Sequence, residues 1–403
     1  MSLKSERNSS AVTSGEFLQK FAVSFEYPVH FARGALAGDN PLLADTLDRL
    51  HESRRHRAAV FVDSGVAASH GQLMSDIREY FHSRPGKIEL AGAPIVVPGG
   101  EAAKASWEPV REVMWTLGNL HLDRQSFVIA IGGGAMLDMV GFAASIVHRG
   151  LRMVRLPTTT LAQNDAGIGV KNGMNEHGQK NFVGTFAPPF AVINDSDFLA
   201  TLSQRDWIGG AAEAFKVALI RDAGFFDFLC EHAAALRGRD AAAMETLVRR
   251  CAVLHLEHIR DGGDPFEFGS ARPLDFGHWS AHKLELMSSH AMGHGQAVAV
   301  GLALDSYYAM SRKLISPADL ERILRALLEC GLPVWCEPLS QRDTAGQLVV
   351  LEGLDQFREH LGGLLCVTLP DGIGRGTEVH HVDYDVVEQG VEFLRGFGKG
   401  GTR

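Results

Sequence analysis

The sequence lacks the features that mark membrane, disulfide-rich and nucleic-acid-binding proteins. No segment approaches the run of about 18 apolar residues that a membrane-spanning helix needs. The cysteines number only five and form no Cys-x-x-Cys pair, which argues against a disulfide framework and indicates a reducing cytoplasm. Positive charge is not in excess: 39 Lys and Arg against 48 Asp and Glu leave a net charge of −9, so we expect no nucleic-acid partner. An anionic substrate would therefore need a local cationic pocket.

The first half of the sequence contains short apolar runs separated by helical patterns. Each run ends at glycine or polar residues, and the four runs are 58–63, 94–98, 126–131 and 151–156. Such runs are typical of a parallel sheet that is buried on both faces. Because ligands bind such sheets at the carboxyl ends of the strands, we expect a site in the loops that follow these runs.

The second half of the sequence has a different pattern of apolar residues. Apolar residues recur at helical spacing over the segments 209–229, 241–259, 273–286, 297–312 and 317–330, and a late run at 364–369 predicts a strand paired with its neighbour. We therefore predict an α/β N-terminal domain with a parallel Rossmann-like sheet, followed by a mostly α-helical C-terminal domain. The predicted ranges are 1–20 for a polar, disordered start, 21–196 for the α/β domain and 197–403 for the helical domain.

Two loops of the first half carry residues suited to phosphate groups. Residues 132–134 are all glycine, follow a predicted strand and open a predicted helix, which fits either a pyrophosphate site or a plain tight turn. Lys171, Lys180 and Asn181 lie in a glycine-containing loop that fits either a phosphate cradle or a solvated surface. Asp165 precedes this loop, and it would either cap a helix or hold a substrate hydroxyl.

The helical half contains a group of residues that would suit a metal. Glu213 and Lys216 share a helix face, as a surface ion pair would, but their neighbours are mostly small or apolar. His278 and His282 also share a helix face, and His294 follows nearby. The zincin protease motif needs a glutamate directly after the first histidine, where this sequence has tryptophan. Glu213 with two of the histidines and an open position would suit a catalytic zinc.

Taken in chain order, these residues belong to a longer series of motifs that resembles the sugar phosphate cyclases, whose best-known member is 3-dehydroquinate synthase. The series extends from about residue 60 to residue 305, and motifs in such an order are not expected by chance. The series comprises Gly100-Glu101-x-x-Lys104, Gly132-Gly133-Gly134 with Asp138, Arg149-Gly150, Pro157-Thr158-Thr159, Asp165 with Lys171, Lys180-Asn181, Glu213 with Lys216, His278 with His282, and His294-Gly295.

The resemblance implies that the first domain binds NAD and the second holds a metal, either zinc or cobalt. The positions that match NAD contacts are Asp63, Glu101, Lys104, Gly133, Gly134, Asp138, Thr158, Thr159 and Lys180. The positions that match metal ligands are Glu213, His278 and His294, so His282 would not be a ligand.

The resemblance also implies a substrate site and a reaction. Phosphate would be held by Lys171, Asn181 and Arg149, with Arg149 coming from the other subunit of a homodimer, and His282 would lie beside it. Asp165 and Lys216 would contact ring hydroxyls, and Arg272 and Asp275 match further substrate contacts. The residues expected to act in catalysis are Lys216, His282, Asp165, Lys171 and Arg272. The implied reaction is a phosphate elimination, classed as a carbon–oxygen lyase, in which NAD takes up and returns a hydride and a carbocycle closes.

One segment departs from the 3-dehydroquinate synthase pattern. The lysine that holds the substrate carboxylate falls on Glu257 or His258, Arg272 is displaced by one residue, and an asparagine position is Asp275. Farther on, an Asp-Lys-Lys motif is replaced by residues 358–360. We therefore expect a 3-dehydroquinate synthase-like cyclase, with a sedoheptulose 7-phosphate cyclase of the valiolone type as the alternative. A metal-dependent NAD polyol or glycerol phosphate dehydrogenase, and a catalytically silent binding protein, are further alternatives.

Overall fold

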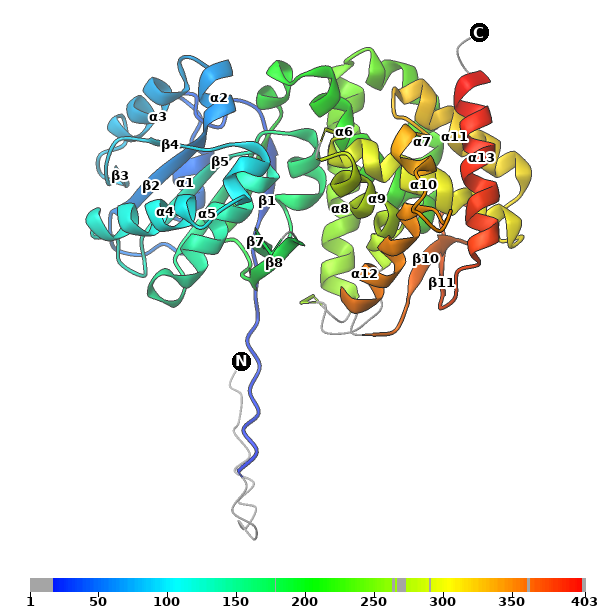
Figure 1. Ribbon diagram of the computed structural model, residues 1–403. Helices are drawn as coiled ribbons and strands as arrows, with labels where there is room; N and C mark the ends of the chain where they lie inside the picture. Colours follow the sequence, from blue (N-terminus) through cyan, green and yellow to red (C-terminus); the bar gives the residue numbers. More distant parts are fainter. Residues whose placement is uncertain are drawn as a thin grey trace, which may run out of the picture.

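The computed structural model describes residues 17–177, 179–262, 265–266, 273–289, 291–360 and 363–400. Most of the predicted disordered start, and Arg272, lie outside these residues. An α/β part and a helical part lie side by side, and residues 17–28 have no regular secondary structure and extend from below the body of the molecule to its first strand (Figure 1).

The N-terminal part is built around a parallel sheet. Its strand order is β1-β9-β6-β5-β2-β3, and β4 also pairs with β2. The strands are β1 (Val29–Ala32), β2 (His56–Asp63), β3 (Ile88–Leu90), β4 (Ile95–Val97), β5 (Phe127–Gly132), β6 (Arg152–Pro157) and β9 (Ala191–Asp195). The four predicted runs correspond to β2, β4, β5 and β6, which confirms the predicted parallel sheet.

Helices cover both faces of the sheet, because successive side chains of each strand point to opposite sides. On β5, Val128 and Ala130 pack toward one layer of helices, whereas Phe127, Ile129 and Ile131 pack toward the other. The first layer contains α4 (Glu108–Asn119) and α5 (Gly134–Ile146), and the second contains α1 (Leu42–Leu47) and α3 (Leu73–His82). The two-sided burial explains why these strands read as continuous apolar runs.

The segment that contains Lys171 and Asn181 was expected to be a loop, and this expectation is wrong. It forms an antiparallel hairpin of β7 (Lys171–Glu176) and β8 (Gln179–Phe186), drawn near the junction of the two parts in Figure 1. Its pattern misled because polar Asn172 and Gly173 are buried while β8 is largely exposed. A strand without an apolar face gives no period-2 signal.

The C-terminal part is mostly helical, as predicted. Its helices are α6 (Gln204–Arg221), α7 (Ala223–Arg237), α8 (Ala241–Asp261), α9 (His278–Met287), α10 (His294–Ser311), α11 (Pro317–Cys330), α12 (Glu352–His360) and α13 (Tyr384–Gly400). The late apolar run contains β10 (Val367–Pro370), which pairs with β11 (Gly376–Val379). None of the helices in the described part of the chain has both the length and the apolar character needed to cross a bilayer.

Two predicted helices are shorter than expected. The pattern over 209–229 is broken at Asp222, whose carboxylate accepts a hydrogen bond from the N–H of Phe225 at 2.9 Å and so starts α7. The pattern over 273–286 begins with a 3₁₀ turn, and α9 starts only after Gly277, which has a left-handed φ of 79°. Apolar spacing continues across both breaks, so only the capping geometry shows them.

Close backbone packing joins α6 to α10 at Gly295. A Cβ atom on Gly295 would lie 2.1 Å from the carbonyl oxygen of Gly209, whereas a Cβ atom on Gly209 would have open space around it. We expect Gly295→Ala to lower the free energy of unfolding by about 1–3 kcal/mol, because the two helices would have to separate. Urea denaturation would measure this loss.

The matched control is Gly209→Ala, which changes the facing helix at the same contact. It is expected to leave stability unchanged or to raise it by about 1 kcal/mol, since alanine favours helix. Equal stability of Gly295→Ala and the unaltered protein would contradict the close approach.

Candidate active site

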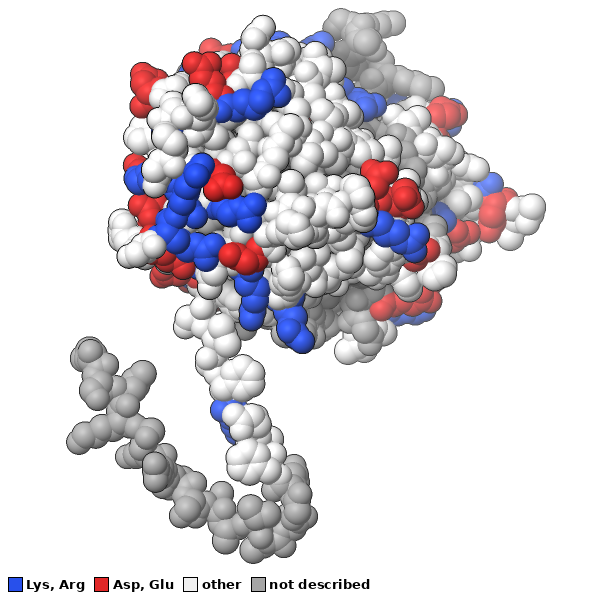
Figure 2. Space-filling view, turned by 90° about the vertical axis from the view of Figure 1, so that its left-hand side faces the viewer, with Lys and Arg blue, Asp and Glu red and all other residues white. Residues whose placement is uncertain are grey.

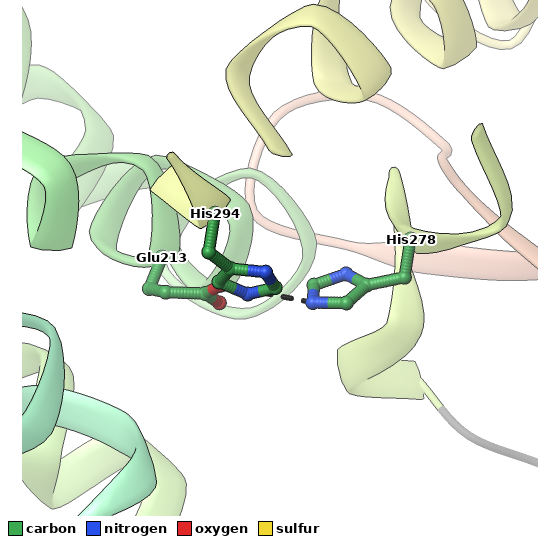
Figure 3. Close-up of side chains that lie close together, drawn as sticks. All are labelled: Glu213, His278 and His294. Carbon is green, nitrogen blue, oxygen red and sulfur yellow. Dashed lines mark ion pairs between the residues drawn. The ribbon is translucent and has the colours of Figure 1, made fainter. Parts of the chain in front are cut away.

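Three predicted metal ligands meet between helices of the C-terminal part (Figure 3). Glu213 lies on α6, His278 is the first residue of α9 and His294 the first residue of α10. Oε1 of Glu213 lies 3.6 Å from Nε2 of His278 and 3.3 Å from Nε2 of His294. The potential ligand atoms of all three lie within 4.8 Å of one another.

The chemistry of this cluster fits a metal ion. Glu213 is fully buried; its Oε2 forms an ion pair with Lys216, whereas its Oε1 faces the two imidazole nitrogens and accepts no hydrogen bond from the described residues. Burial and the Lys216 ammonium lower the pKa of His278 to about 4, so its imidazole is neutral near pH 7, the form that binds metals. Burial alone would lower the pKa of His294, but Glu213 and Glu285 raise it to about 10, so a metal would displace a proton there.

A buried carboxylate holds the start of α9 in place. Asp305, on α10, accepts hydrogen bonds from the N–H of Gly277 at 3.0 Å and from Nε1 of Trp279 at 2.8 Å. Nδ1 of His278 lies 3.1 Å from the carbonyl oxygen of Phe276, which leaves Nε2 directed at Glu213. The turn thus orients His278 toward the cluster before any ligand binds.

His282 lies outside the cluster of Glu213, His278 and His294. It is exposed one helical turn after His278, and its ring centroid lies 5.4 Å from that of His278 and 6.2 Å from that of His294. It therefore borders the cluster from the side open to solvent.

Lys216 and Asp165 lie beside the cluster in the interior. Glu213 and Lys216 form a buried ion pair, so the alternative of a surface pair is wrong. Burial alone would lower the pKa of Lys216, but the carboxylates of Glu213, Asp165 and Asp275 raise it above its ordinary value. Lys216 is therefore a fixed positive charge between three acids.

Sequence reasoning missed His255, a buried residue of α8. Its Nε2 lies 3.2 Å from Oδ1 of Asp165, and its Nδ1 lies 2.9 Å from the carbonyl oxygen of Cys251. Asp165, Glu213 and His255 form a second group within reach of one ion. The group with His278 and His294 fits a cation better, because the Lys216 ammonium already occupies the Asp165 side of Glu213. A polar residue on the apolar face of a predicted helix was the signal for His255.

The predicted NAD residues gather at the carboxyl edge of the sheet. Asp63 ends β2, residues 132–134 connect β5 to α5, and Thr158 follows β6. A Cβ atom on Gly99 would lie 2.1 Å from Oδ1 of Asp63. The hydroxyl of Thr158 is buried without a hydrogen-bond partner in the described chain, so it is available to a ligand. The close approach of the Gly99 backbone to Asp63 and the unsatisfied Thr158 hydroxyl lie at the same edge of the sheet, where a dinucleotide would bind.

Further residues that were predicted to bind NAD lie near this edge. Gly134 begins α5, and Thr159 accepts a hydrogen bond from the N–H of Ala162 at 3.1 Å. Nζ of Lys104 lies 2.6 Å from Oδ2 of Asp138 and also donates to Oδ1 of Asn181. Asn181, predicted to hold phosphate, is thus bonded to a predicted NAD residue here.

Arg155 is the second residue that sequence reasoning missed. Its guanidinium is buried in β6 and donates to the carbonyl oxygens of Gly167 at 3.2 Å, Gly169 at 2.7 Å and Lys171 at 3.3 Å. It also donates to Oδ1 of Asn172 at 2.7 Å. The arginine in the middle of an apolar run was the available signal, and its role is to shape the backbone that carries Lys171.

Arg149, also predicted to hold phosphate, lies beyond the C-terminal end of α5. It lies in the 3₁₀ turn Val147–Arg149 that follows α5, at the opposite end of that helix from the glycine turn. A helix of 13 residues is about 20 Å long. Arg149 therefore lies far from the glycine turn of its own chain.

The segment that departs from the 3-dehydroquinate synthase pattern lies only partly within the described residues. Asp275 is half-buried close to Lys216, whereas Arg272 lies outside the described residues. His258 receives a hydrogen bond from Arg221 on α6. Arg358 and His360 lie on α12, where Arg358 forms an ion pair with Asp355 at 3.0 Å.

The exposed face of the α/β part carries no uniform charge. Figure 2 shows Lys and Arg side chains interspersed with Asp and Glu side chains across this face. An anionic ligand would therefore be attracted by charges at the site rather than by a one-signed surface.

Comparisons with known proteins agree with this arrangement. Residues 94–209 match the family model of the 3-dehydroquinate synthase N-terminal domain, and residues 210–350 match that of the C-terminal domain. A 2-epi-5-epi-valiolone synthase of Streptomyces glaucescens is 34% identical over 363 residues, which cover 89% of this chain and 88% of that protein. A 3-dehydroquinate synthase of Azotobacter vinelandii is 41% identical over 295 residues, which cover 71% of this chain and 77% of that protein.

A solved structure gives the same family. The 2-epi-5-epi-valiolone synthase ValA of Streptomyces hygroscopicus subsp. jinggangensis 5008, with NAD⁺ and Zn²⁺ bound, is 31% identical with a TM-score of 0.83, and the match covers 94% of this chain and 100% of ValA. A probable glycerol dehydrogenase of Sinorhizobium meliloti shares the fold at 18% identity and a TM-score of 0.59. The chain therefore belongs to the sugar phosphate cyclase family, which includes the 3-dehydroquinate synthases and the valiolone synthases.

Proposed function

We propose that this protein is an NAD- and metal-dependent cyclase that eliminates phosphate from a heptulose phosphate and closes a carbocycle, as a carbon–oxygen lyase. The observation that carries the proposal is the buried cluster of Glu213, His278 and His294, whose potential ligand atoms lie within 4.8 Å of one another and in which Oε1 of Glu213 accepts no hydrogen bond from the described residues. A buried carboxylate oxygen that accepts no hydrogen bond is costly unless a ligand completes it. Its relative ValA was solved with NAD⁺ and Zn²⁺ bound, which supports the same pair of groups here.

The metal and NAD would each be held by residues described above. Glu213, His278 and His294 would hold zinc or cobalt, while Asp63, Glu101, Lys104, Gly133, Gly134, Asp138, Thr158, Thr159 and Lys180 would hold NAD. When bound, the metal supplies a Lewis acid and NAD a reversible hydride acceptor, which together make a ring alcohol readily oxidised and its neighbouring C–H acidic.

The protein's own groups would position the sugar phosphate. The Lys216 ammonium would donate to one ring hydroxyl and Asp165 would accept from another, because both are fixed beside Glu213. Lys171, Asn181 and His282 would hold the phosphate. Arg272 and Asp275 remain proposed substrate contacts from the resemblance. These roles place one positive charge at the ring and others at the leaving group, as a phosphate elimination requires.

We also propose a homodimer and a domain boundary at residues 196/197. The homodimer is proposed from the resemblance, in which Arg149 reaches the site of the other subunit. The boundary is supported by the change from β9 to α6. A cytoplasmic location is proposed from the cysteine pattern.

Two substrates follow from the family, and a specific observation supports the second. 3-Deoxy-arabino-heptulosonate 7-phosphate carries a carboxylate, whereas sedoheptulose 7-phosphate does not. The lysine expected to hold that carboxylate is replaced by Glu257 or His258, and His258 is bonded to Arg221 instead. Relatives named for both activities match this chain over most of its length.

One incubation series tests the proposal. The protein is given NAD and zinc and each of the two substrates separately, while inorganic phosphate, NADH and the carbocyclic product are measured. A cyclase releases one phosphate per product formed and no net NADH. Net NADH without phosphate would instead indicate a dehydrogenase, and phosphate release from neither substrate would overturn both substrate assignments.

A further inference from the structure

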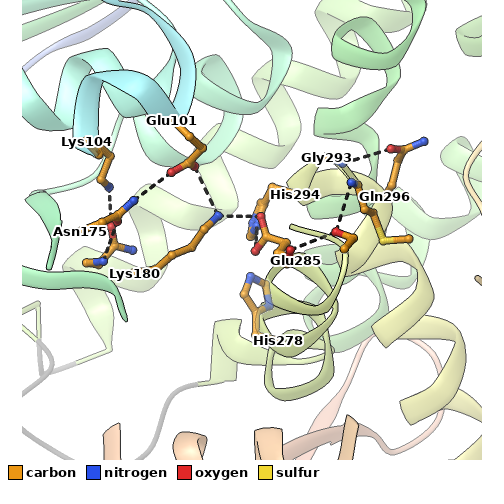
Figure 4. Close-up of polar contacts among 12 residues, drawn as sticks. Glu101, Lys104, Asn175, Lys180, His278, Glu285, Gly293, His294 and Gln296 are labelled. Carbon is orange, nitrogen blue, oxygen red and sulfur yellow. Dashed lines mark hydrogen bonds and ion pairs between the residues drawn. The ribbon is translucent and has the colours of Figure 1, made fainter. Parts of the chain in front are cut away.

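A continuous line of polar contacts connects the predicted NAD site, at the carboxyl edge of the sheet, with the cluster of Glu213, His278 and His294 (Figure 4). It begins at Glu101, in the 3₁₀ turn after β4, and passes through Lys180 on the β7–β8 hairpin. It continues through Glu285 on α9 to His294 on α10. The line therefore crosses from the α/β part to the helical part at the contact between Lys180 and Glu285.

Glu285 makes one contact with each of its carboxylate oxygens. Oε2 lies 3.3 Å from Nδ1 of His294, and Oε1 accepts a hydrogen bond from Nζ of Lys180 at 2.7 Å. The side chain of Glu285 is only 3% exposed, so water does not replace these partners readily. A carboxylate on Nδ1 keeps that nitrogen protonated, so the position that a metal would take is Nε2 of His294, which faces Glu213.

Lys180 connects this carboxylate to the NAD edge. Besides Glu285, its Nζ lies 3.3 Å from Oε1 of Glu101, whose other oxygen accepts from Nδ2 of Asn175 at 3.1 Å. Burial alone would lower the pKa of Lys180, but the Glu285 and Glu101 carboxylates raise it, so the amine is charged. The Lys180 ammonium thus pairs with Glu101 of the α/β part and with Glu285 of the helical part.

We propose that Glu285 is a positioning residue for His294 and that the Lys180–Glu285 contact couples NAD binding to metal binding, each favouring the other. The inference rests on the proposed function, since it assumes that both groups bind. Binding of NAD or of the metal would require the β7–β8 hairpin and α9 to be held together. The first of the two to bind would therefore lose the conformational entropy of ordering this contact, and the second would bind without that loss. By linkage, the factor by which metal tightens NAD must equal the factor by which NAD tightens metal.

The test measures both binding constants on the full-length protein. Protein freed of metal and nucleotide is titrated with NAD with and without zinc, and with zinc with and without NAD, in a competing chelator buffer. In the unaltered protein each ligand is expected to tighten the other about tenfold, within the usual range of such coupling.

Two variants separate the roles of the contact. Glu285→Gln is expected to weaken zinc binding about 10–100-fold, to reduce the coupling factor to about one, and to leave metal-free NAD binding within about twofold. Lys180→Met is expected to abolish the coupling while zinc binding without NAD stays unchanged. Lys180→Arg keeps the charge and reach, so it is expected to retain the coupling.

The control changes a different ion pair on the same helix. Lys283 on α9 pairs with Glu352 at 2.5 Å, so Lys283→Met removes a lysine from α9 without touching the proposed contact. Its coupling factor is expected to equal that of the unaltered protein.

The outcomes are distinct. If NAD and zinc both bind but neither changes the affinity of the other, the coupling is overturned while the proposed function stands. Unchanged coupling in both Glu285→Gln and Lys180→Met would overturn it as well. Binding of neither group would overturn the proposed function together with this inference. If Glu285→Gln does not fold, the more accessible Lys180→Met and Lys180→Arg pair decides the question.

Discussion

Glu213→Gln is expected to lose its bound metal and, with it, nearly all cyclase activity. The amide keeps the size of the side chain but removes the charge that lies 3.6 Å and 3.3 Å from the nitrogens of His278 and His294. Zinc binding is expected to weaken by a factor of about 100 or more, because one of three protein ligands is lost. Metal content per chain after dialysis, measured by mass spectrometry, checks this.

The same substitution also affects stability, since Lys216 would remain buried without its partner. Leaving a buried charge unpaired typically costs about 3–5 kcal/mol, whereas removing both partners is often nearly neutral. The double variant Glu213→Gln with Lys216→Met should therefore recover stability but not metal. His282→Ala is the control and should keep full metal content, because His282 lies outside the cluster. Full zinc occupancy in Glu213→Gln would refute the ligand assignment.

Arg155→Leu is expected to lower the free energy of unfolding by about 3–5 kcal/mol. The guanidinium is buried and donates to three carbonyl oxygens and to Asn172, all of which would lose a charged partner. Unsatisfied buried acceptors cost about 1–3 kcal/mol each before the structure relaxes. Urea denaturation measures the loss, and faster hydrogen exchange in β7 should accompany it.

A matched control lies on the same strand. Arg152 also carries a guanidinium in β6, but it is half-exposed and binds Glu52 at 2.5 Å and 2.9 Å. Because such an ion pair near the surface contributes only about 1 kcal/mol, Arg152→Leu should be much less destabilising. Similar losses in the two variants would show that Arg155 does not organise the loop before Lys171.

The parallel sheet and most helices were predictable because their signals are local. Continuous apolar runs ending at glycine or polar residues predicted β2, β4, β5 and β6, and helical spacing predicted the C-terminal helices. The β7–β8 hairpin was missed because its buried residues follow no period-2 apolar pattern, and the polar Asn172 among them is held by Arg155 from another strand. The break at Asp222 was missed because a cap changes backbone direction without changing apolar spacing.

By itself, the sequence determined that an α/β sheet precedes a helical part and that its motifs follow the order of the sugar phosphate cyclases. Spacing left open which histidines would accompany Glu213, and only the resemblance named His278 and His294. The tertiary structure decided that these three meet, because they lie on separate helices whose packing brings them together. It also decided that Lys216 is buried and that Lys180 reaches Glu285, since burial and contacts across the chain depend on folding rather than on neighbours in sequence.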